Sequence, residues 1–327
     1  YYRWTQWFFS FLYQKGLAYK KKAAVNWCES CQTVLANEQV VNGLCDRSKD
    51  PVIQKELEQW FFRITEYVED KGKTSGLISG LKKIDWPEST KLGQLNWIGK
   101  KEGIEISYPI SGTNEQIVCF TTRPDTNFGA TFIVIAPEHA FAQKVAKENP
   151  EVYEYIKKSL KKTELERQEE GRKKTGVFTG YYGMNRLNNK PIPIWVSDFV
   201  LAGFGTGAVV GVPGHDRRDF EFAFAFGIPV IRVVVASDGD QSEIARLEQV
   251  QEEQGTMINS EFLNGLDIST ATQKMMDHLE SEGHGKRVTT YKLRDWLVSR
   301  QRYWGAPIPI VYDDQGQEYL VPDGELP

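Results

Sequence analysis

The chain has 327 residues, of which 40% are hydrophobic and 26% charged, and its formal net charge is -4. These values predict an ordinary globular protein that is long enough for two domains. The net charge does not indicate a nucleic-acid partner, so any basic surface must be local. No apolar run approaches the length of a membrane-spanning helix, and the first residues lack the pattern of a signal peptide.

Two further features concern the context of the chain. It begins with Tyr1 rather than Met, and an aromatic stretch follows directly, which suggests a segment of a longer protein. Four cysteines, three of them close together, do not form the pattern of a secreted disulfide framework. We therefore expect a cytoplasmic protein in a reducing environment.

The first hundred residues predict short, mixed elements. Apolar residues near helical spacing favour one amphipathic helix over residues 1–20. Strands are predicted over residues 23–27 and 60–64, and a helix follows the second strand up to about Leu81.

A cysteine cluster lies between these two strands. Cys28 and Cys31 have the C-x-x-C spacing that lets two thiolates bind one metal ion from a tight turn. Cys45 offers a third thiolate, but Ser48 stands where a second C-x-x-C pair would place its last sulfur. Structural zinc sites normally have four good ligands, and serine is a poor one. The cluster is therefore a candidate zinc site or a degenerate knuckle, and the missing ligand favours the second interpretation.

A different pattern begins near Lys101 and mixes strands with helices. Predicted strands cover residues 104–109, 116–121, 131–136, 192–196, 208–212 and 230–235. Predicted helices cover residues 138–173, 240–254 and 268–282. The charged run from Lys157 to Lys174 is interpreted mainly as a solvated helix face. The mixture indicates an α/β domain rather than a sandwich.

One segment that could carry chemistry covers residues 119–129, CFTTRPDTNFG, where a strand ends and a threonine-rich turn follows. Hydroxyl groups both donate and accept hydrogen bonds, so Thr121 and Thr122 can hold a carbonyl, a ribose hydroxyl or a water. Arg123 offers a rigid fork of donors suited to phosphate or to the 3′ end of RNA. The alternative is a surface turn in which Asp125 caps the next element.

A second segment covers residues 204–220, FGTGAVVGVPGHDRRDF. Its glycines allow close approach of the backbone, but it lacks the lysine of a P-loop. If a helix begins near Asp216, the carboxylates of Asp216 and Asp219 lie on one face and could clamp an ammonium group. Taken singly, Asp216 is more simply a helix N-cap, and His215 a loop histidine.

Together the two segments resemble the editing domain of class I aminoacyl-tRNA synthetases. The patterns TTRPDT and GTGAV-x-x-VPGHD-x-RD are similar to those of the leucine enzymes. Residues 25–28 and 296–309 resemble the junctions where the editing insertion leaves and rejoins the catalytic domain. The HIGH and KMSKS signatures of the aminoacylation site are absent from the sequence, so the chain as given is not expected to activate leucine.

The resemblance implies an α/β fold in which a mixed-sheet, β-barrel-like editing domain is surrounded by helices beside a small flanking subdomain from the synthetase body. Residues 101–290 would form the editing domain. Residues 1–100 would form a catalytic-domain helix and a zinc-knuckle-like linker, and residues 291–327 the return to the catalytic domain.

The resemblance also implies hydrolysis of tRNA-Leu that carries a wrong amino acid of the norvaline or isoleucine type. Thr126 would exclude leucine, Asp219 would bind the α-amino group with help from Asp216, and Arg123 would hold the terminal adenosine. The expected catalytic residues are Thr121, Thr122 and Asp219. The expected substrate-binding residues are Arg123, Thr126, Phe204, Val210, His215, Asp216 and Asp219. No side chain is assigned as a general base.

Cofactors and partners follow from the same resemblance. Editing would need no cofactor, zinc would be confined to Cys28, Cys31 and Cys45, and ATP and Mg would serve only the full-length parent enzyme. The partners would be the 3′ end of tRNA-Leu and the remainder of the synthetase, in a monomer without membrane contact. Two alternatives stay open, namely a valyl- or isoleucyl-type editing domain and a tRNA-docking module without activity. A metal-dependent hydrolase is less favoured, because the cysteines lie far in sequence from residues 119–129, which we call the threonine motif.

Overall fold

The computed structural model of the chain describes residues 1–35, 39–41, 43–162, 166–167, 171–203, 205–252, 254–298 and 305–327. It divides into two compact units. Unit 1 comprises Tyr1–Gly99 and Tyr291–Pro327, and unit 2 comprises Lys100–Thr290. Among the described residues, no helix is both long and apolar enough to cross a membrane.

Unit 1 is built around a four-stranded antiparallel sheet in the order β15-β5-β1-β2. Its helices are α1 (Tyr2–Gln14), α2 (Leu77–Gly80) and α3 (Glu88–Ile98). Its strands are β1 (Ala18–Cys28), β2 (Thr33–Leu35), β3 (Val40–Val41), β4 (Leu44–Cys45), β5 (Ile53–Phe62), β15 (Trp296–Leu297), β16 (Ile310–Tyr312) and β17 (Glu318–Leu320). The long β1–β5 pair forms the centre of this sheet.

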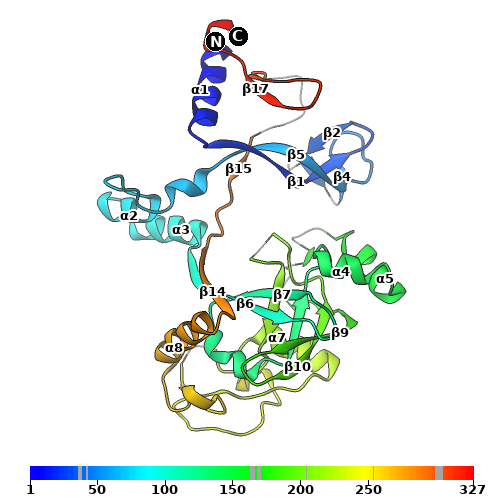
Figure 1. Cartoon of the computed structure of the whole chain (residues 1–327), viewed down its shortest axis with the longest axis vertical. Coiled ribbons are helices and arrows are strands. Elements are labelled where there is room, and N and C mark those ends of the chain that lie inside the picture. The colour runs from blue at the N-terminus through cyan, green and yellow to red at the C-terminus, as the bar shows by residue number, and fades with distance from the viewer. Residues whose placement is uncertain are drawn as a thin grey trace. The chain divides into compact units, whose positions relative to one another are not determined.

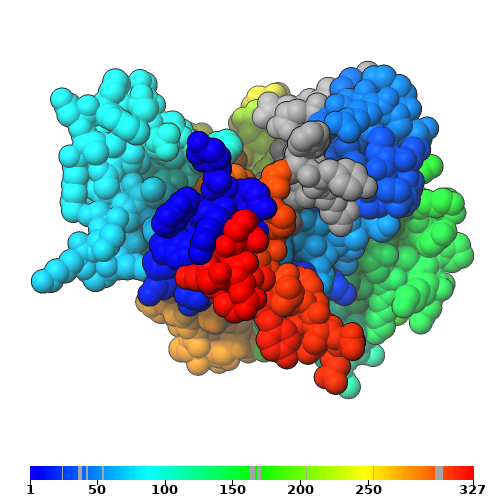
Figure 2. Space-filling view, turned by 90° about the horizontal axis from the view of Figure 1, so that it is seen from above, coloured from blue at the N-terminus to red at the C-terminus, as the bar shows by residue number. Residues whose placement is uncertain are grey.

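Helix α1 lies beside the C-terminal segment of the chain (Figures 1 and 2). Gln6 Nε2 donates to the carbonyl oxygen of Pro307 at 3.0 Å, and Arg3 Nη2 donates to that of Asp323 at 3.2 Å. The buried side of the helix packs Phe9 edge-on against Trp60 of β5. The two ends of the sequence therefore belong to one folded unit.

The helix predicted over residues 1–20 is too long. It ends at Gln14, because Gly16 takes a positive φ of 70° and β1 already begins at Ala18. The helix predicted up to Leu81 is also wrong, since that stretch holds a single 3-10 turn (Ile64–Tyr67) and the four-residue α2. The strand predicted over residues 23–27 lies inside the longer β1, whereas the strand predicted over residues 60–64 matches only the end of β5, which stops at Phe62 before the 3-10 turn begins at Ile64.

Unit 2 contains two main sheets, in the orders β11-β8-β10-β9 and β14-β6-β7. Its strands are β6 (Lys101–Pro109), β7 (Gln116–Thr121), β8 (Phe132–Ile135), β9 (Val177–Asn185), β10 (Lys190–Val196), β11 (Ala208–Gly211), β12 (Val234–Val235), β13 (Thr256–Met257) and β14 (Gly285–Thr290). Its helices are α4 (Ala140–Val145), α5 (Pro150–Ser159), α7 (Arg217–Phe226) and α8 (Ile268–Ser281). Buried apolar side chains from both sheets pack into a common core.

Within the described parts of unit 2, the strands form several small sheets and no closed barrel, so the architecture is mixed α/β. The two main sheets are linked by an isolated antiparallel bridge between Ile110 and Gly183. One bridge does not continue the hydrogen-bonded ladder that closes a barrel. The continuous apolar run predicted as a doubly buried strand is confirmed, because all four residues of β8 are buried between β10 and β11.

The helix predictions for unit 2 hold in part. The prediction for residues 268–282 is confirmed by α8. Residues 138–173 instead divide into α4 and α5, because Asn149 caps a new helix that begins at Pro150. Residues 240–254 are wrong as a helix, since their described part holds only the 3-10 turn Leu247–Gln249.

The glycine at position 211 gives a test of this core. Gly211 pairs with Phe132 across β11 and β8, and an added Cβ would lie 2.2 to 2.5 Å from atoms of the buried Phe132 ring. We expect Gly211→Ala to lower the free energy of unfolding by about 1–3 kcal/mol, because the ring must shift within a packed core. Urea unfolding measures this change.

The matched control is Gly93→Ala on α3, where an added Cβ meets open space. This control should leave stability unchanged or raise it by up to about 1 kcal/mol, because alanine favours helix interiors. Equal unfolding midpoints for Gly211→Ala and the unchanged chain would contradict the packing described here.

Candidate functional site

The threonine motif lies at the end of β7 in unit 2. Thr121 is the last residue of the strand, and its Oγ1 accepts a hydrogen bond from Arg123 N at 3.0 Å. Thr122 is exposed beside it. The strand end thus presents one exposed hydroxyl and one that also fixes the turn. The buried 3-10 helix Pro124–Gly129 follows.

Arg123 and Asp125 form a tight ion pair inside this motif. Asp125 is completely buried and accepts from Arg123 Nε at 3.0 Å and from Arg123 Nη2 at 2.8 Å. Thr272 of α8 donates to the same carboxylate at 3.0 Å. Asp125 therefore does not cap an exposed turn, and the surface-turn alternative is wrong. The guanidinium of Arg123 is held in one orientation by this pair.

Thr126 and Asn127 are fixed from several directions. Thr126 is 1% exposed, and its hydroxyl donates to the carbonyl oxygen of Arg123 at 2.8 Å. Tyr108 donates to Asn127 Oδ1 at 2.6 Å, and Asn185 Nδ2 donates to the carbonyl oxygen of Asn127 at 2.9 Å. Because its hydroxyl is engaged, Thr126 has a fixed side-chain orientation.

The glycine-rich segment lies beside the end of β7. Gly205 has a φ of 56°, and a Cβ there would lie 3.3 Å from the Cβ of Phe120. Val210 on β11 is nearly buried, and Thr131 N donates to the carbonyl oxygen of Gly211 at 3.1 Å. The chain thus brings its two motifs together, as their joint interpretation required. Phe204 lies outside the described residues.

Helix α7 begins immediately after this segment. Asp216 caps it, since its carboxylate accepts from Arg218 N at 2.8 Å and from Asp219 N at 3.1 Å. The simple N-cap interpretation of Asp216 is therefore confirmed. It also places Asp219 in the first turn, where exposed N–H groups favour negative charge.

Asp219 is the most perturbed carboxylate of this region. Burial, followed by repulsion from Asp216, raises the pKa of Asp219 to about 8, against a lowering by the Val212 N–H that donates to its Oδ2 at 2.9 Å. The second carboxylate oxygen can accept from a ligand. A buried carboxylate of this kind gains most from a cation placed against it.

His215 uses both ring nitrogens within the fold. Nδ1 lies 2.9 Å from the carbonyl oxygen of Gln251, and Nε2 accepts from Val233 N at 2.9 Å and from Val234 N at 3.2 Å. Burial lowers the pKa of His215 to about 4. The imidazole is therefore neutral at physiological pH, carries its proton on Nδ1, and holds three backbone segments together.

Sequence reasoning missed the segment at Gln251 and Glu252. Arg123 Nη1 donates to the carbonyl oxygen of Glu252, and Arg217 N donates to Glu252 Oε1 at 3.0 Å. With the His215–Gln251 contact, this segment ties the threonine motif to the start of α7. Its run of Gln and Glu predicted a helix and gave no signal for this role.

The cysteine cluster lies in unit 1, and its donor set fits a thiolate-bound metal in part. The Sγ atoms of Cys28, Cys31 and Cys45 lie within 4.8 Å of one another, and those of Cys31 and Cys45 are 3.9 Å apart. Two thiolates on one tetrahedral zinc ion lie about 3.8 Å apart. Ser48 Oγ lies 3.2 Å from Cys28 Sγ, so the serine that stands in place of the expected fourth sulfur lies next to the cluster. Three thiols could therefore bind zinc.

Comparisons with known proteins agree with this organisation. Residues 95–280 match the family described as leucyl-tRNA synthetase, editing domain. Residues 1–109 and 274–326 match the family described as tRNA synthetases class I (I, L, M and V). The two matches together define the class of protein, namely the class I aminoacyl-tRNA synthetases that have an editing domain.

Individual relatives show which family within this class the chain belongs to. The chain is 49% identical over 334 residues to leucine–tRNA ligase of Dehalococcoides mccartyi strain 195, and 48% identical over 329 residues to that of Clostridium tetani. All of the chain is covered, but only 40% and 39% of these relatives. It therefore belongs to the leucyl-tRNA synthetase family, as a segment with the editing domain between pieces of the class I catalytic region.

A solved structure is similar over the whole chain. It is described as the ternary complex of Agrobacterium radiobacter K84 agnB2 LeuRS, tRNA and LeuAMS. The TM-score is 0.75 and the sequence identity is 36%, with 100% of this chain and 37% of the other chain covered.

The buried Asp219 predicts a specific dependence of stability on pH. Its pKa is about 8 in the folded chain and about 3.9 in an unfolded chain, so the folded state binds more protons between these values. The stabilising effect of the proton is complete below about pH 4 and is lost as the pH rises through about 8. Asp219→Asn keeps the size of the side chain but does not titrate, so this part of the pH dependence should disappear.

Urea unfolding of both proteins at about pH 5 and about pH 8 measures the effect. The unchanged chain should lose more free energy of unfolding across this interval than Asp219→Asn. The contribution of His215, whose depressed pKa acts in the opposite direction at lower pH, is common to both proteins. If the unchanged chain and Asp219→Asn lost the same free energy of unfolding between these pH values, Asp219 would be ionised in the folded chain at neutral pH.

Proposed function

We propose that unit 2 is a post-transfer editing domain that hydrolyses mischarged tRNA-Leu to tRNA and free amino acid. The observation that carries the proposal is that the editing-family match spans both motifs, which lie side by side in unit 2. Its domain limits would be residues 101–290, flanked by catalytic-domain segments at 1–100 and 291–327. The intact protein would be cytoplasmic and monomeric.

In this proposal, Asp219 binds the α-ammonium group of the aminoacyl ester. The ammonium compensates the buried carboxylate, and its approach lowers the pKa of Asp219 toward the ionised form. Asp216 supports this arrangement by capping α7 rather than by contacting substrate. Because Asp219 favours a bound cation, the site would prefer a tRNA 3′ end that carries an amino acid over one that does not.

The threonine motif would position the reacting ester. The Thr122 hydroxyl can contact the ester carbonyl or the attacking water, and Thr121 holds the turn in place. Arg123, fixed by Asp125, would present its outer edge to the terminal adenosine. Hydrogen bonds that strengthen as negative charge develops on the carbonyl oxygen would lower the barrier. His215 is excluded as a general base, because both its nitrogens are occupied.

A need for editing follows from the energetics of hydrophobic pockets. One methylene group changes binding by only about 1–3 kcal/mol, so norvaline and isoleucine are poorly rejected during aminoacylation. A second pocket that excludes leucine then raises the accuracy. Val210 would line that pocket, and Thr126 would limit its size. Zinc, where bound at the three cysteines, would stabilise unit 1 and take no part in hydrolysis.

The size limit at Thr126 is tested with two variants. We expect Thr126→Ala to hydrolyse correctly charged Leu-tRNA at least about tenfold faster than the unchanged chain, because a smaller residue admits leucine. Thr126→Val keeps the volume but loses the hydroxyl, so it should still exclude leucine. The measurement is release of labelled leucine from Leu-tRNA. Equal slow release by all three proteins would remove the steric role.

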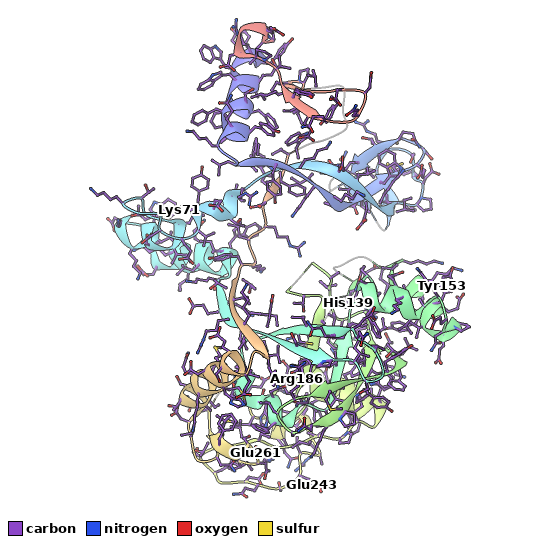
Figure 3. All side chains as sticks on the ribbon, in the orientation of Figure 1. Lys71, His139, Tyr153, Arg186, Glu243 and Glu261 are labelled. Carbon is purple, nitrogen blue, oxygen red and sulfur yellow. The ribbon has the colours of Figure 1, made fainter. Side chains whose placement is uncertain are left out.

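The role of Asp219 is tested with mischarged tRNA. We expect Asp219→Ala to lower kcat/KM for deacylation of norvalyl- or isoleucyl-tRNA by about 10- to 100-fold, the value of a lost hydrogen bond to a charged group. Glu243→Ala, at an exposed carboxylate of unit 2 (Figure 3), is the control and should be fully active. Wild-type rates for Asp219→Ala would exclude this residue from the site. A chain without any deacylation would instead favour a docking module.

A further inference from the structure

One stretch of unit 2 carries a local excess of positive charge. Residues 157–174 contain eight Lys or Arg and four Glu, a net charge of +4 in a chain whose net charge is -4. The remainder of the chain therefore carries -8. The charge pattern of these residues predicts a solvated helix face, but α5 ends at Ser159 and the described residues that follow it are not all helical.

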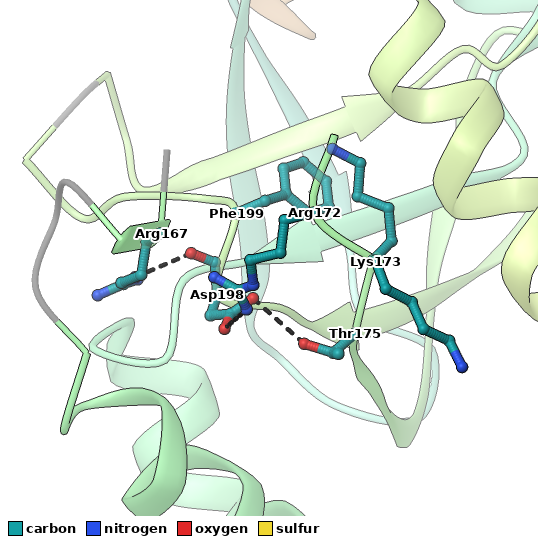
Figure 4. A pocket seen from close by; sticks show the side chains of 7 residues that line it. Arg167, Arg172, Lys173, Thr175, Asp198 and Phe199 are labelled. Carbon is teal, nitrogen blue, oxygen red and sulfur yellow. Dashed lines mark hydrogen bonds and ion pairs between the residues drawn. The ribbon is translucent and has the colours of Figure 1, made fainter. Parts of the chain in front are cut away.

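A pocket lies within this stretch, after the end of β10 (Figure 4). It is lined by Arg167, Arg172, Lys173, Lys174, Thr175, Asp198 and Phe199. The lining holds four cations and one carboxylate, and outside the lining Glu138 pairs with Arg167 and Glu221 with Lys174. With all three carboxylates ionised, the four cations still leave a net charge of +1 (4 − 3).

The cations of the pocket are held by built contacts. Buried Arg167 donates from Nε to the carbonyl oxygen of Asp198 and from Nη2 to that of Val200, both at 2.8 Å. Asp198 also pairs with Arg172 and, at 2.7 Å, with Lys162. Burial opposes ionisation of Asp198, but these two cations hold its pKa below the usual range. These contacts hold Arg167 and Arg172 in place beside Asp198.

The basic surface continues onto α5, from which Tyr153 projects (Figure 3). A second pocket there is lined by Glu154, Tyr155, Lys157, Lys158 and Lys161. The Tyr155 hydroxyl lies 2.9 Å from Thr175 Oγ1 and accepts from Asp198 N at 3.2 Å. These contacts join the two pockets into one surface, which we call the basic surface.

The basic surface borders the helix that carries Asp219. Lys174 Nζ lies 3.3 Å from Glu221 of α7 and is close enough to Asp219 to lower its pKa. Phe199 packs against Phe222 of the same helix at 5.6 Å between ring centres. A polyanion bound to the basic surface would thus approach the proposed hydrolytic site.

We propose that the basic surface binds the phosphodiester backbone of the RNA strand whose 3′ end reaches Asp219. This inference rests on the proposed function and adds a partner-binding surface to it. RNA fits better than a single small anion, because the cations extend over two joined pockets. Phosphate contacts would guide the strand, while discrimination between amino acids would stay with the site.

The test replaces two exposed lysines, one from each pocket. Lys161 and Lys173 are exposed, so Lys161→Ala/Lys173→Ala should leave the fold intact. The control is Lys190→Ala, an exposed lysine at the opposite end of β10. Binding of tRNA that carries no amino acid to each 327-residue protein is measured by fluorescence anisotropy at salt concentrations between about 50 and about 200 mM.

Each lost phosphate contact reduces the slope of log affinity against log salt by about 0.7–0.9. We therefore expect the double variant to reduce the slope by about 1.4–1.8 and to bind about tenfold more weakly at low salt, with the control unchanged. In deacylation of mischarged tRNA, KM should rise while kcat stays the same. An unchanged slope, or no tRNA binding by the unchanged chain, would overturn the inference. Absent deacylation with the expected change of slope would sink the proposed function alone.

Discussion

The arrangement of the site depends on the hydrogen bonds of one buried histidine. His215 donates to Gln251 and accepts from the backbone at Val233 and Val234. Gln251 is followed by Glu252, whose backbone and side chain hold Arg123 and the start of α7. Each buried donor or acceptor left without a partner costs about 1–3 kcal/mol. Loss of this ring would therefore leave the Gln251 carbonyl and the Val233 and Val234 N–H groups without this partner, and would weaken the link between the two motifs.

These hydrogen bonds help to explain how the carboxylate of Asp219 can stay buried. Asp219 is buried next to a second carboxylate, and only the Val212 N–H contact and more distant cations offset the cost. Such a group is stabilised by an ammonium ligand far more than an exposed carboxylate would be. In the proposed function, selectivity for an aminoacyl ester follows from this electrostatic preference of Asp219.

The sequence predicted those elements whose residue types strongly favour one kind of local structure. Apolar runs correctly predicted β8, β10 and β11, and the Asp216 cap correctly placed the start of α7. Both motifs were found because they are local in sequence. β9 was missed, since Gly180 and Gly183 interrupt its alternation.

Tertiary contacts were beyond the reach of the sequence. The polar stretch around Gln251 and Glu252 has the composition of a solvated helix, and only the surrounding fold shows that it ties the motifs together. Asp125 suggested an exposed cap but forms a buried ion pair with Arg123. The barrel-like sheet expected from the resemblance is replaced, in the described residues, by small sheets joined through Ile110 and Gly183.

A structure with a bound ligand can test the proposed role of Asp219. We expect a nonhydrolysable analogue of aminoacylated adenosine to bind unit 2 with its ammonium group within about 3 Å of an Asp219 carboxylate oxygen, the distance of a charge-assisted hydrogen bond. A crystal structure of the 327-residue chain with a norvaline analogue measures this distance. An ammonium group bound elsewhere, with Asp219 still enclosed by protein, would contradict the account.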